Sequence, residues 1–132
     1  MRLSEAILLG SVGTKQGFGV FAMYSGGETR CALGAALTAI GECTPCHNQG
    51  VDAGPYIKIT DIWPWTHNHV VNPTDNSRIP AAIDIRTMIW MLNDSAKWTR
   101  PQIAAWVAEQ EVKLGVVEQV EAEIKDGEHA TA

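Results

Sequence analysis

This chain of 132 residues lacks a long apolar run near its start and a nucleotide-binding motif, and it carries little positive charge. The longest uncharged apolar stretch near the start, Ala6 to Gly13, has eight residues, whereas a membrane-spanning helix needs about 20. Glu5 precedes this stretch and polar residues follow it at once, which does not fit a secretory signal. We therefore expect a cytoplasmic protein without a membrane-spanning segment.

The balance of charge argues against a nucleic-acid partner. Ten Lys and Arg residues stand against 15 Asp and Glu, so the formal net charge is −5. Because affinity for phosphate backbones comes from Lys and Arg contacts, no nucleic acid is expected to bind. The segment Gly17-Phe18-Gly19 lacks the third glycine of a dinucleotide fingerprint, and no G-K-[ST] sequence occurs. A nucleotide site is therefore not predicted.

Cysteine is scarce as well. Three are present, Cys31, Cys43 and Cys46, and an odd number leaves one thiol outside any disulfide pairing. This favours a reducing compartment. Cys31 lies in an apolar segment, where a free thiol usually behaves as a small core side chain. No chemistry is assigned to it.

Helical periodicity marks the first third of the chain. A helix is predicted over residues 3–10, with Ser4 as a candidate cap and with an apolar face made of Leu3, Ile7 and Leu8. Residues 31–40 are apolar on most sides and rich in small side chains, which predicts a buried helix in close contact with a neighbour. Gly41 should end that helix.

Two more helices are predicted towards the other end. The first begins at Pro80 or Ala81 and ends at Asn93-Asp94-Ser95. The second follows Thr99, which forms a capping-box pattern with Gln102. Because the second helix presents Gln102, Ala105, Glu109 and Gln110 and has no basic face, we interpret the pair as a packing hairpin and not as a DNA-binding helix-turn-helix.

The middle of the chain is irregular in pattern. Five of the six prolines fall within residues 41–80, where we expect an irregular arm with a short strand over residues 56–62. The glycine-rich residues 13–27 predict a loop or a short hairpin. The fold class is thus mainly α: a single helical domain over residues 1–125, with that Pro- and Trp-rich arm and at most a short β-hairpin, followed by a frayed tail at 126–132.

The motif Cys43-Thr44-Pro45-Cys46-His47 carries the clearest chemistry. Its C-x-x-C-H spelling is that of c-type haem attachment, in which both thiols bind the porphyrin and His47 ligates the iron. Alternatively, Cys43 and Cys46 form a zinc site with His67 and His69, since two such thiolates reach one tetrahedral centre. If His67 and His69 share a strand, their rings point to one face. The favoured interpretation is that both cysteines are reduced and bind no cofactor.

Two tryptophans and several carboxylates leave other roles open. Trp63 and Trp65, in a proline-stiffened segment, either cover the core or anchor a partner, because tryptophan is enriched at interface hot spots. An Asp/His hydrolase site remains an alternative, with His67 and His69 and a carboxylate from Asp61, Asp75 or Asp84. No catalytic residue is assigned, and a non-catalytic protein is expected.

Several segments together resemble a group of small uncharacterised bacterial and phage proteins. These are the LSEAI stretch at residues 3–7, the CALGAA stretch at 31–36, and LND at 92–94 with the WTR..IA.WV pattern at 98–107. The resemblance covers about half the chain and implies a helical architecture and a phage or prophage context. Many proteins of that group carry a C-P-x-C pair and histidines that resemble a zinc site. Here the corresponding stretch reads Asn72-Pro73-Thr74-Asp75.

The sequence therefore predicts a small soluble accessory or interaction protein. Its expected partner is another protein or a second copy of the chain. The zinc-binding module and the haem electron-transfer protein remain as the two alternatives.

Overall fold

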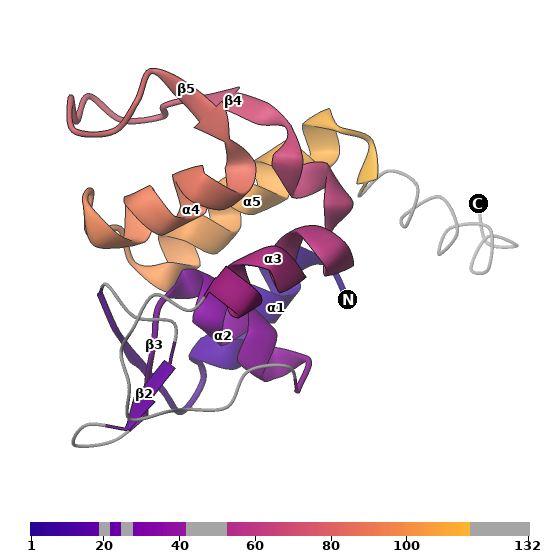
Figure 1. Cartoon of the computed structure of the whole chain (residues 1–132), viewed down its shortest axis with the longest axis vertical. Coiled ribbons are helices and arrows are strands. Elements are labelled where there is room, and N and C mark those ends of the chain that lie inside the picture. The colour runs from indigo at the N-terminus through magenta and orange to yellow at the C-terminus, as the bar shows by residue number, and fades with distance from the viewer. Residues whose placement is uncertain (19–21, 25–27, 42–52, 117–132) are drawn as a thin grey trace, which may run out of the picture.

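The computed structural model describes residues 1–18, 22–24, 28–41 and 53–116, and within them the fold is mainly helical (Figure 1). The helices are α1 (Leu3–Ser11), α2 (Ala32–Ala39), α3 (Ala53–Ile62), the 3₁₀ turn η1 (Pro64–His67), α4 (Ile85–Asp94) and α5 (Arg100–Lys113). The strands are β1 (Lys15–Gln16), β2 (Ala22–Tyr24), β3 (Glu28–Arg30), β4 (His69–Val71) and β5 (Ala82–Asp84). The predicted mainly-α fold class is confirmed.

The strands form two small sheets at opposite ends of the molecule (Figure 1). In the first, β3 lies in the centre, parallel to β1 and antiparallel to β2. In the second, β4 pairs antiparallel with β5, and Val70 lies opposite Ile83. The glycine-rich residues 13–27 thus contain β1 and β2, whereas β3, the antiparallel partner of β2, lies just beyond the predicted stretch.

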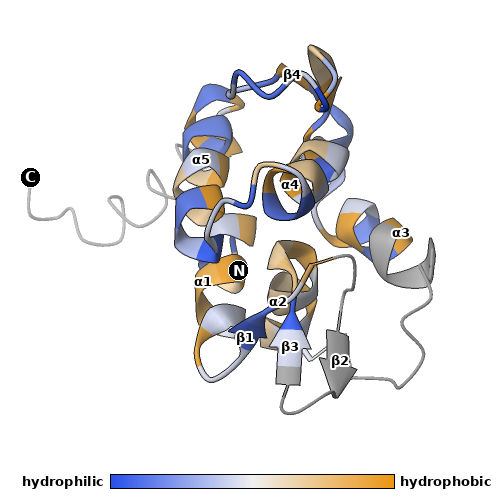
Figure 2. Cartoon of the chain, turned by 90° about the vertical axis from the view of Figure 1, so that its left-hand side faces the viewer, coloured by the Kyte–Doolittle hydropathy of each residue, from blue (hydrophilic) through white to orange (hydrophobic). Residues whose placement is uncertain are grey.

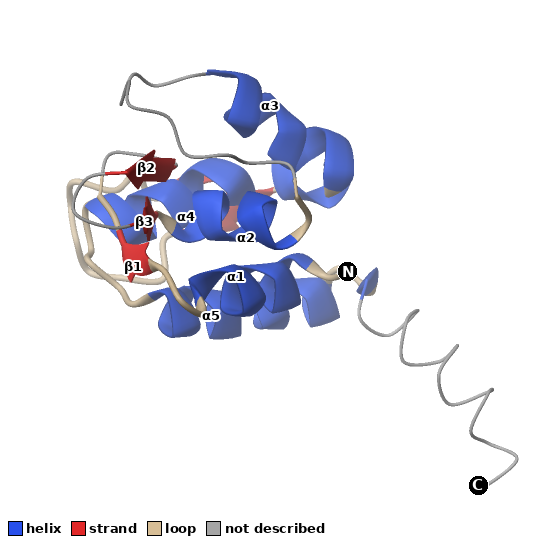
Figure 3. Cartoon of the chain, turned by 90° about the horizontal axis from the view of Figure 1, so that it is seen from below, coloured by secondary structure: helices blue, strands red, loops and turns tan. Residues whose placement is uncertain are grey.

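The helices stack in three tiers (Figure 3). Helices α1 and α5 form one outer tier, α2 and α4 the middle tier, and α3 lies on the other side of the middle tier. Residues at helical spacing from all of these tiers meet in one apolar core; the largest fully buried are Leu3, Ile7, Leu33, Leu37, Ile59, Ile85, Met88, Ile89, Leu92 and Ile103. Figure 2 shows that α1 and α2 are largely hydrophobic, whereas α5 mixes hydrophobic and hydrophilic residues. The outer helix α5 therefore has a face that the core does not use.

Helices α1 and α2 approach each other closely, as the small residues of α2 predict. A Cβ atom added to Gly10 would lie 1.6 Å from the carbonyl oxygen of Ala35. Only glycine allows this crossing, because the clash would be with backbone and not with a flexible side chain. Gly41 adopts φ +77° just after α2, which confirms it as the end of that helix.

The predicted strand over residues 56–62 is wrong, because this segment lies in α3. Its isoleucines and threonine favour a strand locally. The helix, however, brings Ile59 and Trp63, the residue just after α3, to the same side, and both are buried in the core. The core contact therefore outweighs the local preference. Part of the expected irregular arm is consequently regular helix.

The start of α4 also differs from the prediction. Residues 82–84 pair with β4, and the helix begins only at Ile85. The Asp84 carboxylate accepts hydrogen bonds from the backbone N–H of Thr87 at 3.0 Å and from its hydroxyl at 2.9 Å. This side-chain cap satisfies a first-turn donor and sets the boundary.

The cap of α1 lies elsewhere than expected. Ser4 is inside the helix, and both its N–H and its hydroxyl donate to the carboxylate of Glu111 on α5. Glu111 is fully buried and stabilises the helix N-terminus from a neighbouring helix. Leu8, which was assigned to the buried face, is 46% exposed. By contrast, the capping box of Thr99 and Gln102 at the start of α5 is confirmed.

Candidate functional site

The cysteine motif cannot be assigned a geometry. Cys43, Cys46 and His47 lie outside the described residues, so the haem and zinc hypotheses stay predictions. An absorption spectrum and elemental analysis of the purified chain test both.

The two histidines of the zinc hypothesis lie on different elements. His67 ends the turn η1, whereas His69 begins β4, so they do not share a strand as the hypothesis assumed. The Nδ1 atom of His67 lies within hydrogen-bonding distance of the Pro64 carbonyl oxygen. Both rings are on exposed residues. Within the described part of the chain, no three His, Cys, Asp or Glu side chains gather as metal ligands would.

The carboxylates considered for a hydrolase site are dispersed. Asp84 lies opposite His69 in the β4–β5 pairing, but its carboxylate is engaged by Thr87 as the cap of α4. Asp61 is exposed on α3, and Asp75 is exposed in the loop between β4 and β5. Since one carboxylate is occupied and the others are solvated, nothing in this geometry assigns them a reaction.

The tryptophans of the central segment serve the core. Trp63 is 5% exposed, and its indole N–H donates to the Met1 carbonyl at 3.0 Å. Trp65 is half-buried against the same core. Trp63 therefore takes the core position that the sequence left open, and only part of Trp65 is accessible to a partner.

The LND segment is a structural junction. The side chain of Asn93 is fully buried; its oxygen accepts from the Ala32 N–H at 3.1 Å and from the Gln16 amide at 2.9 Å. Its amide donates to the carbonyl of Gly17 at 2.8 Å. Asn93 thus joins the end of α4 to the start of α2 and to β1.

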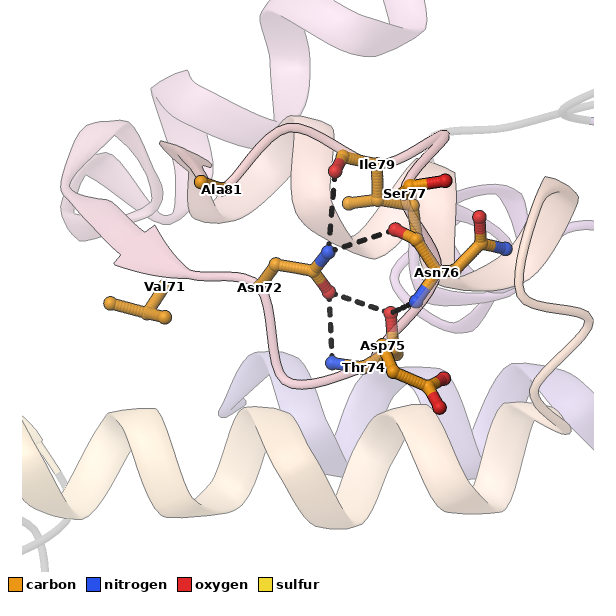
Figure 4. A pocket seen from close by; sticks show the side chains of 8 residues that line it. All are labelled: Val71, Asn72, Thr74, Asp75, Asn76, Ser77, Ile79 and Ala81. Carbon is orange, nitrogen blue, oxygen red and sulfur yellow. Dashed lines mark hydrogen bonds between the residues drawn. The ribbon is translucent and has the colours of Figure 1, made fainter.

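The loop between β4 and β5 is held by its own side chains (Figure 4). Asn72 accepts from the N–H of Thr74 at 2.8 Å and from its hydroxyl at 2.7 Å, and it donates to the carbonyls of Asn76 and Ile79. Asn76 also donates to the Ser95 carbonyl at 3.3 Å, which ties the loop to the end of α4. These bonds fix the conformation of residues 72–79.

An open groove of about 390 Å³ lies between this loop and α5. Six residues line it: Pro73 from the loop, Trp98 from the turn before α5, and Gln102, Ala105, Trp106 and Glu109 from α5 itself. The four α5 positions are spaced i, i+3, i+4 and i+7 and share one face of the helix. Because Ala105 is small, it leaves space between the larger side chains around it.

The lining combines apolar walls with polar ends. Trp106 is 7% exposed and belongs to both the core and the groove, while Trp98 is half-buried. The amide oxygen of Gln102 accepts from the Thr99 N–H at 2.8 Å, so this side chain is fixed by the capping box. Glu109 is exposed and is the one ionised group among the lining residues. Such a surface offers apolar packing and one carboxylate, and its lining holds no nucleophile.

No known protein family, curated protein or solved structure matches this chain. A functional assignment therefore rests on the chemistry of the groove. The sequence predicted Gln102, Ala105, Glu109 and Gln110 as the outward face of this helix. The first three are exposed, whereas Gln110 is buried, so that part of the prediction is wrong. The contributions of Pro73 and Trp98 were missed. Trp98 lies only four residues before Gln102 but outside the helix, and Pro73 lies 29 residues before Gln102. The loop that carries Pro73 reaches this face of α5 only in the folded structure.

Within the described residues, no helix combines the length and the apolar character needed to span a membrane.

Proposed function

We propose that this chain is a small non-catalytic accessory or interaction protein that holds a segment of a protein partner in the groove between Pro73 and α5. The resemblance of its two ends adds a bacterial or phage context to this proposal. The observation that carries it is an accessible groove with two tryptophans and a proline on a rigid support.

The support is rigid because each wall has its own fixation. Helix α5 begins at a complete capping box and buries Ile103, Trp106 and Val107 in the core. The loop that carries Pro73 is held by the hydrogen bonds of Asn72 and Asn76. A preformed surface loses little conformational entropy on binding, which favours recognition.

The size and composition of the groove suit a peptide segment. Its volume of about 390 Å³ falls at the lower end of the roughly 300–1,000 Å³ of ligand sites, enough for one or two side chains. Tryptophan is among the residues that dominate interface energies. A binding role is favoured over a catalytic one because the lining holds one carboxylate and no His, Cys, Ser or Lys.

The test is a selection of 12-residue peptides, displayed as a random library, on the immobilised full chain. We expect enriched peptides whose affinity falls about tenfold or more with Trp98→Ala, since a central tryptophan anchor is worth at least that. Ala105→Trp should fill the groove and abolish binding, because Ala105 is exposed and its replacement does not disturb the core.

Ile57→Trp is the matched control, since Ile57 is also exposed and helical but lies on α3, on the opposite side of the helix stack (Figure 3). It should leave binding unchanged. Circular dichroism checks that each variant is folded. The proposal fails if no peptide is enriched over a blank surface, or if the enriched peptides bind the Ala105→Trp variant as tightly as the parent chain.

A further inference from the structure

We infer that the partner segment is basic: a Lys or Arg side chain lies along Trp98 and Trp106, and its cation meets the carboxylate of Glu109. This inference rests on the proposed function and names the chemistry of the partner. It follows from the charge of the groove, from its apolar walls and from the charge of the other candidate occupants.

The charge of the groove has one sign. Glu109 is its one ionised lining residue, and the structure gives it no ion pair within the described residues. Lys113 lies one turn further along α5 on an exposed position, but it does not pair with Glu109. An exposed carboxylate beside an apolar wall attracts a cation at short range.

A second carboxylate lies near the groove. Asp75 follows Pro73 by two residues and is exposed. In Figure 4 its carboxylate extends from the loop on the side of α5, away from the hydrogen bonds around Asn72. Asp75 does not line the groove, but its negative charge beside the loop adds to the preference for a positively charged segment.

The apolar walls suit the stem of a basic side chain. Lys and Arg lay their methylene groups along apolar surface and keep the charged end in water. An indole ring attracts such a cation as well, and tryptophan does so best among the aromatic residues. The neighbouring Lys97 does not occupy this place, because its Nζ lies 4.2 Å from the centre of the Phe18 ring.

Two other occupants are disfavoured by charge. The segment after the described residues, 117–132, carries five acidic residues and one lysine. A second copy of the chain brings a further formal charge of −5. Both would place negative charge near Glu109, and like charges at an interface oppose association.

The test uses groove-dependent peptides from the selection above and measures their affinities by fluorescence anisotropy. We expect Lys or Arg to be enriched at one position, and replacement of that residue by Gln to weaken binding about five- to tenfold. Glu109→Gln should weaken the Lys or Arg peptide about two- to fivefold, as removal of an exposed ion pair does. In a double-mutant cycle the two changes should be non-additive, because they remove the same contact.

Asp61→Asn is the matched control, since it removes the same charge from an exposed helical position on α3. It should leave the affinity within about 1.5-fold of the parent value, whereas salt at about 0.5 M should reduce the effect of Glu109→Gln. If groove-dependent peptides show no basic preference, or if Glu109→Gln behaves like Asp61→Asn, the inference is overturned while the proposed function stands. If no groove-dependent peptide exists, both fall.

Discussion

Replacement of Arg100 by methionine should destabilise this protein severely. Arg100 is 6% exposed, and no carboxylate pairs with its guanidinium within the described residues. It donates instead to the hydroxyl and the carbonyl of Thr14, at 2.8 and 2.6 Å, and more weakly to the carbonyls of Ser11, Lys15 and Arg30 at 3.3 to 3.4 Å. One side chain thus holds the end of α1, β1 and β3 against the start of α5.

The magnitude follows from these bonds. Hydrogen bonds to a charged group contribute about 1.5 kcal/mol each at the low end, so the two short ones to Thr14 account for about 3 kcal/mol. The three longer ones add little, and the Arg30 carbonyl keeps a second donor, the Gly17 N–H at 2.9 Å. Burial lowers the pKa of Arg100, but an arginine stays charged at any pH at which proteins fold, so its partners are always engaged.

Thermal and urea unfolding, followed by circular dichroism, measure the loss. For a chain of this length, about 3 kcal/mol corresponds to a fall in Tm of roughly 10 °C. Arg100→Lys should be intermediate, because an ammonium cannot reach all the acceptors at once. Arg78→Met, at an exposed position, is the matched control and should change stability by less than about 0.5 kcal/mol. A Tm for Arg100→Met within 2 °C or so of the parent would refute the claim that Arg100 holds α1, β1 and β3 against α5.

Three further changes test the packing and the caps. Gly10→Ala should cost about 3 kcal/mol in urea unfolding, because the new methyl group would meet the Ala35 backbone; a smaller cost than 1 kcal/mol or so would contradict that close crossing. Asn93→Ala should cost about 3 kcal/mol, since it leaves a buried backbone N–H unpaired, and unchanged urea stability would count against the junction. Arg2 lowers the pKa of Glu5 through a side-chain hydrogen bond, so Glu5→Gln should cost only a few tenths of a kcal/mol, a cost that is complete above about pH 4.5. That small contribution disappears as the pH falls through the lowered pKa, and an effect that persisted at pH 2 would oppose this interpretation.

Local signals predicted most of the helical scaffold. The capping box at Thr99 and the small-residue run before Gly41 are confirmed because both depend on neighbours within four residues. The segment 56–62 failed because its β-branched residues favour a strand, while the gain in the actual fold comes from Ile59 and Trp63 meeting the core. The start of α4 was placed too early, because residues 82–84 pair with β4, which no local pattern reveals.

The candidate site was only half visible from the sequence. Gln102, Ala105 and Glu109 were recognised as exposed positions on one helix, but Gln110, which was assigned to the same face, is buried. Pro73 could not be added to them, because it lies 29 residues before Gln102 and comes to line the same groove only in the folded structure. The role of Glu111 was missed for the same reason, since its contact with Ser4 spans 107 positions.

For this chain, apolar periodicity and capping residues predicted the helices α1, α2, α4 and α5, because those preferences act within one or two turns. They did not predict α3 or the exposure of Leu8. The tertiary structure decided that Glu111 and Asn93 bind the first turns of α1 and α2. It also decided that β5 replaces the predicted start of α4, and that Pro73 of the β4–β5 loop lies beside the exposed face of α5. These outcomes depend on contacts between residues far apart in sequence, whose free energy exists only once the tiers have packed.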